Sequence, residues 1–132
     1  MAKVSVIGAG SWGTALALLL SKNGHDVTMW SILEDEIRML DKEREHKSKL
    51  PDTMKFTTDL KEAVEGKDFL VLAVPSTFTR GTAKNMCPYV AEGQIIVDVA
   101  KGIEEATLMT LSQQIEDEIP QADVAVLSGP SH

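Results

Sequence analysis

Short runs of apolar, often β-branched residues alternate along the chain with segments in which apolar residues recur at helical spacing. The short runs predict buried strands over residues 3–7, 27–30, 54–58, 69–74, 94–99 and 124–127. The segments between them predict helices over residues 12–22, 34–45, 59–64, 77–87 and 107–119. Strands that alternate with helices favour a parallel sheet, and nearly uninterrupted apolar strands indicate burial on both faces. We expect a single α/β domain over residues 1–132 with a doubly wound, mostly parallel sheet.

The composition is that of an acidic globular protein. The 132 residues are 43% hydrophobic and 25% charged, and the net charge of −7 argues against general binding of nucleic acid. The single cysteine, Cys87, excludes an internal disulfide framework and is interpreted as a small core residue. No signal peptide is visible, and the apolar run over residues 15–20 is too short to span a membrane. We therefore expect a cytoplasmic protein without membrane insertion and without a metal site.

Three glycines follow the first predicted strand in the string V-I-G-A-G-S-W-G-T-A-L-A. A G-x-G-x-x-G pattern between a strand and a helix is the dinucleotide-binding fingerprint of Rossmann-type sheets. Gly8 would permit the tight turn, Gly10 would let the backbone approach a diphosphate, and Gly13 would let the helix pack closely on the strand. The diphosphate would lie on free amides at the positive end of the helix. Ser11 could add a hydroxyl donor, and Trp12 could be a core anchor, a border of the cofactor site, or both.

The residues after the second predicted strand leave the choice of nicotinamide cofactor open. An NAD-preferring site usually has Asp or Glu at that strand end. Here Ser31, Ile32 and Leu33 follow the strand, and the first acids come about one helical turn later. No arginine stands there to receive a 2′-phosphate either. We expect NAD(P) as cofactor, with a slight preference for NADP.

Three later strand ends also carry candidate site residues, because ligands of open α/β sheets lie beyond the carboxyl ends of the strands. In A-V-P-S-T-F, Pro75 would lie beside the ribose and nicotinamide half of the cofactor. In V-D-V-A-K-G-I-E, Lys101 would bind an anionic or carbonyl-bearing substrate. In L-S-G-P-S-H, Gly129 and Ser131 either form a turn or offer an amide and a hydroxyl to the same substrate.

These strings, in this order and spacing, resemble the N-terminal half of bacterial glycerol-3-phosphate dehydrogenase [NAD(P)+] over the whole chain. The resemblance implies reversible hydride transfer between a nicotinamide cofactor and glycerol 3-phosphate or dihydroxyacetone phosphate, feeding phospholipid synthesis in the cytoplasm. By resemblance, Ser11, Trp12 and Lys101 contact the cofactor, and Lys101, Gly129 and Ser131 contact the substrate. Ser31 and Ile32 occupy positions where members of the family often carry a basic or histidine residue.

The family continues into a helical C-terminal domain with a general acid/base lysine and much of the phosphate pocket. This chain stops at His132, so we expect no catalytic residue within it, binding of the dinucleotide, and little turnover. The face that the missing domain would cover suggests self-association, such as a homodimer. Two alternatives remain. One is a related two-domain dehydrogenase for 6-phosphogluconate, 3-hydroxyisobutyrate or ketopantoate, against which Trp12 and K-G-I-E argue. The other is a dinucleotide-binding module without catalysis.

Overall fold

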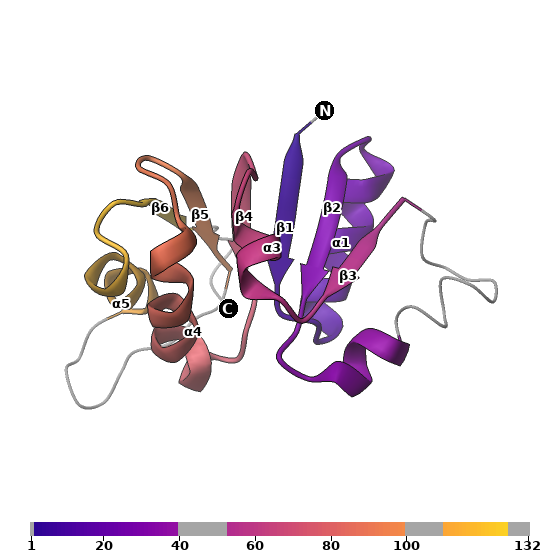
Figure 1. Ribbon diagram of the computed structural model, residues 1–132, viewed down its shortest axis with the longest axis horizontal. Helices are drawn as coiled ribbons and strands as arrows, with labels where there is room; N and C mark the ends of the chain where they lie inside the picture. Colours follow the sequence, from indigo (N-terminus) through magenta and orange to yellow (C-terminus); the bar gives the residue numbers. More distant parts are fainter. Residues whose placement is uncertain (1, 40–52, 100–109, 127–132) are drawn as a thin grey trace, which may run out of the picture.

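A computed structural model of the chain describes residues 2–39, 53–99 and 110–126, with the side chains of Ser11 and Trp12 excepted. Six parallel strands form one sheet in the order β3-β2-β1-β4-β5-β6 (Figure 1). The strands are β1 (Lys3–Ile7), β2 (Asp26–Trp30), β3 (Lys55–Thr57), β4 (Phe69–Leu72), β5 (Ile95–Asp98) and β6 (Asp123–Val126). The predicted doubly wound, parallel α/β sheet is therefore confirmed for the described residues.

The helices lie between the strands, as the sequence pattern predicts. They are α1 (Ser11–Lys22), α3 (Leu60–Val64), α4 (Thr79–Met86) and α5 (Leu111–Glu118), with short 3-10 helices η1 (Ser76–Phe78) and η2 (Cys87–Tyr89) on either side of α4. Residues 34–39 are also helical. The ends of the helices predicted over 34–45 and 107–119 lie partly outside the described residues. The Asp59 carboxylate accepts a hydrogen bond from the backbone of Lys61 and caps α3, as expected.

Most predicted strand bounds differ from the structure by one residue at an end, and two predicted elements differ by more. The apolar run over residues 69–74 is strand only as far as Leu72, because the chain turns away from the sheet before Pro75. The helix predicted over residues 77–87 is three consecutive helical pieces, and proline near the start of η2 favours the tighter winding there. Pro75 precedes η1 and Pro88 lies within η2, and neither proline has an N–H group to donate to regular hydrogen bonding.

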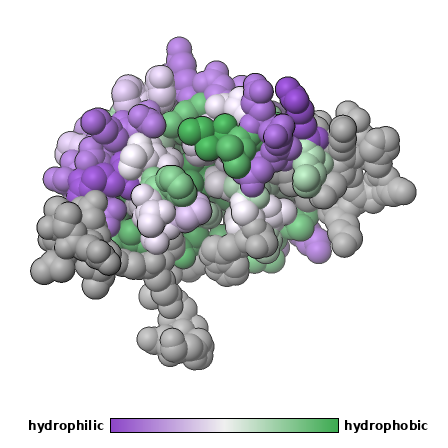
Figure 2. Space-filling view, turned by 90° about the horizontal axis from the view of Figure 1, so that it is seen from below, coloured by the Kyte–Doolittle hydropathy of each residue, from purple (hydrophilic) through white to green (hydrophobic). Residues whose placement is uncertain are grey.

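The order of the strands reverses at β1. Strands β2 and β3 lie on one side of it, and β4, β5 and β6 lie on the other. The carboxyl ends of the strands form the lower edge of the sheet in Figure 1. Figure 2 looks onto this edge, where apolar surface gathers between more hydrophilic flanks. In open parallel sheets, ligands bind at this edge where the strand order reverses.

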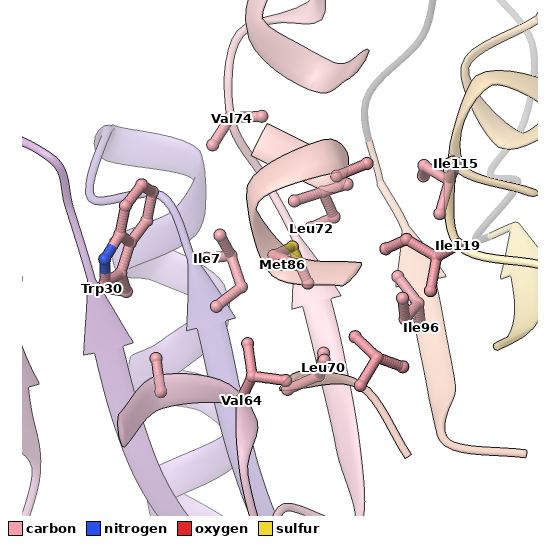
Figure 3. Close-up of a cluster of buried hydrophobic side chains, with 13 residues drawn as sticks. Ile7, Trp30, Val64, Leu70, Leu72, Val74, Met86, Ile96, Ile115 and Ile119 are labelled. Carbon is pink, nitrogen blue, oxygen red and sulfur yellow. The ribbon is translucent and has the colours of Figure 1, made fainter. Parts of the chain in front are cut away.

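Two apolar clusters cover the two faces of the sheet, since successive strand residues point to opposite sides. One face is covered by α3, α4 and α5, and Figure 3 shows its cluster. That cluster includes Ile7, Leu70, Leu72, Ile96, Val64, Met86, Ile115 and Ile119. The other face is covered by α1, with a cluster that includes Val4, Val6, Val27, Met29, Val71 and Ala17. Both faces being buried explains why the strands are apolar without alternation.

The side chain of Gln94 joins the segments that precede β4 and β5, on the edge of the sheet opposite the carboxyl ends. It is 8% exposed, donates hydrogen bonds to the carbonyls of Val64 (2.9 Å) and Lys67 (3.1 Å), and accepts one from the amide of Ala91 (3.0 Å). Each such bond contributes about 1 kcal/mol net, and partners left unsatisfied in the interior cost more. The loops before β4 and β5 therefore depend on this one amide.

Replacing Gln94 with alanine is expected to lower the free energy of unfolding by about 3 kcal/mol, because three hydrogen bonds are lost together. Urea denaturation followed by circular dichroism measures the change. The exposed neighbour Glu92 provides the control, since Glu92→Ala is expected to change stability by less than about 0.5 kcal/mol. Equal stabilities of the two variants would contradict the bridging role of Gln94.

Candidate dinucleotide site

The turn from β1 to α1 is closely packed around two of its three glycines. Gly8 has φ of +126°, and a Cβ placed there would lie 2.7 Å from the carbonyl oxygen of Ala73. A Cβ on Gly13 would lie 2.6 Å from the carbonyl oxygen of Gly8. No real Cβ approaches a backbone atom so closely. These two glycines are therefore required by the protein itself: they bring α1 against β1, and the turn against the segment that follows β4.

Gly10 differs, because nothing in the described protein requires a glycine there. Its φ of −70° and ψ of 177° suit any residue, and an added Cβ would meet no heavy atom within 4 Å. Gly10 is the N-cap of α1, has no side-chain cap, and is followed by a first turn without acidic residues. The first amides of a helix lack partners within the helix, and they carry the positive end of its dipole. A site for an anion that must approach the backbone has these properties.

A cleft of about 840 Å³ opens beside this turn at the carboxyl ends of the strands. Its walls come from the glycine turn, the end of β2 and the segment from the end of β4 into α4. Six of the expected cofactor residues line it, namely Gly8, Gly10, Gly13, Ser31, Ile32 and Pro75. Ser11 and Trp12 lie in the first turn of α1. Lys101, Gly129 and Ser131 lie outside the described residues.

The cleft wall is mainly apolar, and besides the expected Ile32 it includes side chains that were not expected from the sequence. Ile32, Leu33 and Phe78 are exposed there by 74%, 56% and 63%. Thr82 and Asn85 of α4 add polar groups. Phe78 could have been noticed, because an aromatic residue in a loop at a strand end is a common element of binding sites. Thr82 and Asn85 carry no such signal, since they reach the cleft only through the packing of α4.

Two polar side chains meet at the end of β2. The Ser31 hydroxyl donates a hydrogen bond to the carboxylate of Glu36 at 2.6 Å and accepts one from the Leu33 amide at 3.1 Å. Ser31 is 4% exposed, and Glu36 is half-buried on the cleft wall. From the sequence we expected no carboxylate at this strand end. That expectation is wrong, because the carboxylate of Glu36 lies there. Glu36 comes from the following helix and folds back to the strand end through the turn.

Trp30 also lines the cleft, but its indole N–H is already bonded within the protein. The Trp30 indole is 7% exposed and donates to the carbonyl of Thr58 at 3.0 Å. Cys87 is half-buried against the cluster under α4, as expected for a small core residue.

Within residues 2–39, 53–99 and 110–126, no three His, Cys, Asp or Glu side chains group in a way that could hold a metal ion. The helices in those ranges are all too short or too polar to cross a membrane.

A parallel sheet with reversed strand order, a glycine turn into a helix N-terminus and a cleft at the carboxyl ends define an α/β domain of the Rossmann class. Residues 3–132 match the family described as NAD-dependent glycerol-3-phosphate dehydrogenase N-terminus. The chain belongs to this family.

Curated relatives and a solved structure agree with this assignment. The chain is 61% identical to glycerol-3-phosphate dehydrogenase [NAD(P)+] of Agathobacter rectalis and 51% identical to that of Fusobacterium nucleatum. These matches cover 100% of this chain but 41% and 42% of the relatives. The crystal structure of glycerol-3-phosphate dehydrogenase from Coxiella burnetii superimposes with a TM-score of 0.86 at 32% identity, over 99% of this chain and 42% of that chain. The chain thus spans about two fifths of the length of its relatives and aligns with their N-terminal part.

Proposed function

We propose that this chain is the cofactor-binding half of an NAD(P)-dependent glycerol-3-phosphate dehydrogenase. The observation that carries the proposal is Gly10, a glycine that the surrounding protein does not need and that faces open space at a helix N-terminus. Family membership also supports this proposed function, since the relatives bear the name glycerol-3-phosphate dehydrogenase [NAD(P)+]. The related dehydrogenases for other substrates are not favoured by the family match.

The residues of the cleft suit the two ends of a dinucleotide. The amides of the first turn of α1, with Ser11 and Trp12, would hold the diphosphate. Ser31 and Ile32 lie at the end of β2, where the adenine ribose of a Rossmann-bound cofactor belongs. Pro75 lies beyond β4, on the other side of the strand reversal, and would border the ribose and nicotinamide. When bound, the cofactor supplies the hydride.

Substrate binding and catalysis would involve residues outside those that the structure describes. Lys101 would contact cofactor and substrate, and Gly129 and Ser131 would contact the substrate, which we propose to be glycerol 3-phosphate or dihydroxyacetone phosphate. The general acid/base would be a lysine beyond His132, in the remaining part of a longer enzyme. Residues 1–132 would form one domain, and the enzyme would act in the cytoplasm, in glycerophospholipid synthesis, with a homodimer as the proposed assembly.

Titration of the folded chain with NADH and NADPH tests the cofactor site directly. We expect at least one dinucleotide to shift the amide resonances of Gly8, Gly10 and Gly13 in a saturable way, because the diphosphate would accept hydrogen bonds at this turn. The amide of Gly93, in a turn outside the cleft lining, serves as an internal control and should not move. Absence of shifts with both dinucleotides would defeat the proposal.

A further inference from the structure

The carboxylate of Glu36 occupies the corner of the cleft at the end of β2. It lines the cleft together with Ser31, Ile32 and Leu33. Its side chain starts from the helical segment 34–39 and returns to the strand end, where its oxygen lies 2.6 Å from the Ser31 hydroxyl. A negative charge is thus placed where Rossmann-type sites usually read the adenine ribose.

Ser31 holds this carboxylate in a defined position. Because Ser31 is 4% exposed and accepts a hydrogen bond from the Leu33 amide, its hydroxyl proton is directed to Glu36. A serine hydroxyl has one proton to donate, so the Ser31–Glu36 bond uses it fully. An ionised carboxylate has about four lone-pair positions, and one bond leaves several of them for hydroxyl groups of a ligand.

No positive charge offsets Glu36 on the described cleft wall. Among residues 2–39, 53–99 and 110–126, the cleft is lined by no lysine, arginine or histidine. Arg38, the cation of the same helical segment, lies 3.6 Å from Glu34 and 4.0 Å from Asp35 and does not line the cleft. A 2′-phosphate in this corner would therefore meet a carboxylate without a described counter-charge, and the repulsion between like charges so placed would weaken its binding.

We propose that Glu36 makes this chain select NAD(H) over NADP(H). Its free carboxylate oxygen accepts hydrogen bonds from the adenine ribose hydroxyls of NAD(H) and repels the 2′-phosphate of NADP(H). The inference rests on the proposed dinucleotide site, and it reverses the slight preference for NADP that the residues directly after β2 suggested. The sequence rule looks for an acid at the strand end itself, whereas here the acid reaches that position from six residues after the last residue of β2.

Parallel titrations with NADH and NADPH test this specificity in the wild-type chain, in Glu36→Gln and in Glu34→Gln. The wild-type chain is expected to bind NADH about tenfold more tightly than NADPH or better. In Glu36→Gln the ratio should fall towards one, mainly through tighter NADPH binding, because glutamine keeps the shape and the bond to Ser31 without the charge. Glu34→Gln is the matched control: Glu34 is 72% exposed and does not line the cleft, so its ratio should stay near that of the wild type.

The possible outcomes separate the inference from the proposed function. If the wild-type chain binds both dinucleotides equally or NADPH more tightly, the role of Glu36 is refuted while the dinucleotide site stands. An unchanged ratio in Glu36→Gln refutes it as well. Binding of neither dinucleotide defeats the proposed function and this inference with it. Should Glu36→Gln fail to fold, the wild-type chain at rising salt provides the second measurement: screening should narrow the NADH preference, and a constant ratio would count against charge repulsion.

Discussion

Replacing Gly10 with alanine is expected to weaken the binding of NADH or NADPH by about tenfold or more and to leave the free energy of unfolding nearly unchanged. The new methyl group meets no protein atom within 4 Å, so the folded chain accommodates it. It would instead occupy space that the diphosphate needs against the amides of α1. Forcing an extra methyl into a filled contact costs about 1–3 kcal/mol, and each 1.4 kcal/mol corresponds to about a factor of ten in affinity.

Gly81 supplies the matched control for Gly10→Ala. It lies in α4, does not line the cleft, and likewise has no heavy atom within 4 Å of an added Cβ. Gly81→Ala should keep the dinucleotide affinity and raise stability by up to about 1 kcal/mol, since alanine favours a helix interior over glycine. Calorimetric titration and thermal unfolding measure both quantities. Unweakened binding by Gly10→Ala would contradict a diphosphate at this turn.

Replacing Gly8 with alanine is expected to lower the free energy of unfolding by about 3 kcal/mol or more. Two costs combine there. A backbone with φ of +126° strains an L-residue by about 1–3 kcal/mol. The Cβ would also lie 2.7 Å from the carbonyl oxygen and 2.8 Å from the carbonyl carbon of Ala73, which are backbone atoms held beside the sheet, and overpacking adds about 1–3 kcal/mol. Against a typical stability of about 5–15 kcal/mol, this loss is large.

Gly93 separates the two costs of the Gly8 substitution. Its φ of +77° is also positive, but a Cβ there would meet no heavy atom within 4 Å. Gly93→Ala should therefore carry the backbone strain alone, and urea denaturation of both variants should show the larger loss for Gly8→Ala. If the two losses were equal, the contact between the turn and the segment after β4 would not be as close as described.

Much of the fold follows from local features that are visible in the sequence. The strand at residues 3–7 was predicted with the bounds that β1 has, because its β-branched residues Val4, Val6 and Ile7 favour a buried strand. Asp59 was predicted as an N-cap from its residue type and position alone. At α5, the Thr110–Gln113 capping box was missed, although its letters are present in T-L-S-Q.

Some residues of the candidate site could likewise be found from the sequence, whereas others could be found only from the structure. Gly8, Gly10 and Gly13 could be found from their spacing, because each acts through the backbone of a short continuous segment. Glu36 could not be found by counting residues from the strand, because its position depends on a turn that Ser31 closes. Thr82 and Asn85 reach the cleft through the packing of α4 on the sheet, which no local pattern encodes.

The sequence by itself determined the alternation of strands and helices, the parallel class of the sheet and the glycine turn, since these depend on residues close together in the chain. Only the tertiary structure decided that the strand order reverses at β1, that α4 forms one wall of the cleft, and that a carboxylate stands at the end of β2. Those features depend on which distant segments pack together. Packing is a property of the whole core, so it shows itself only when the chain is folded.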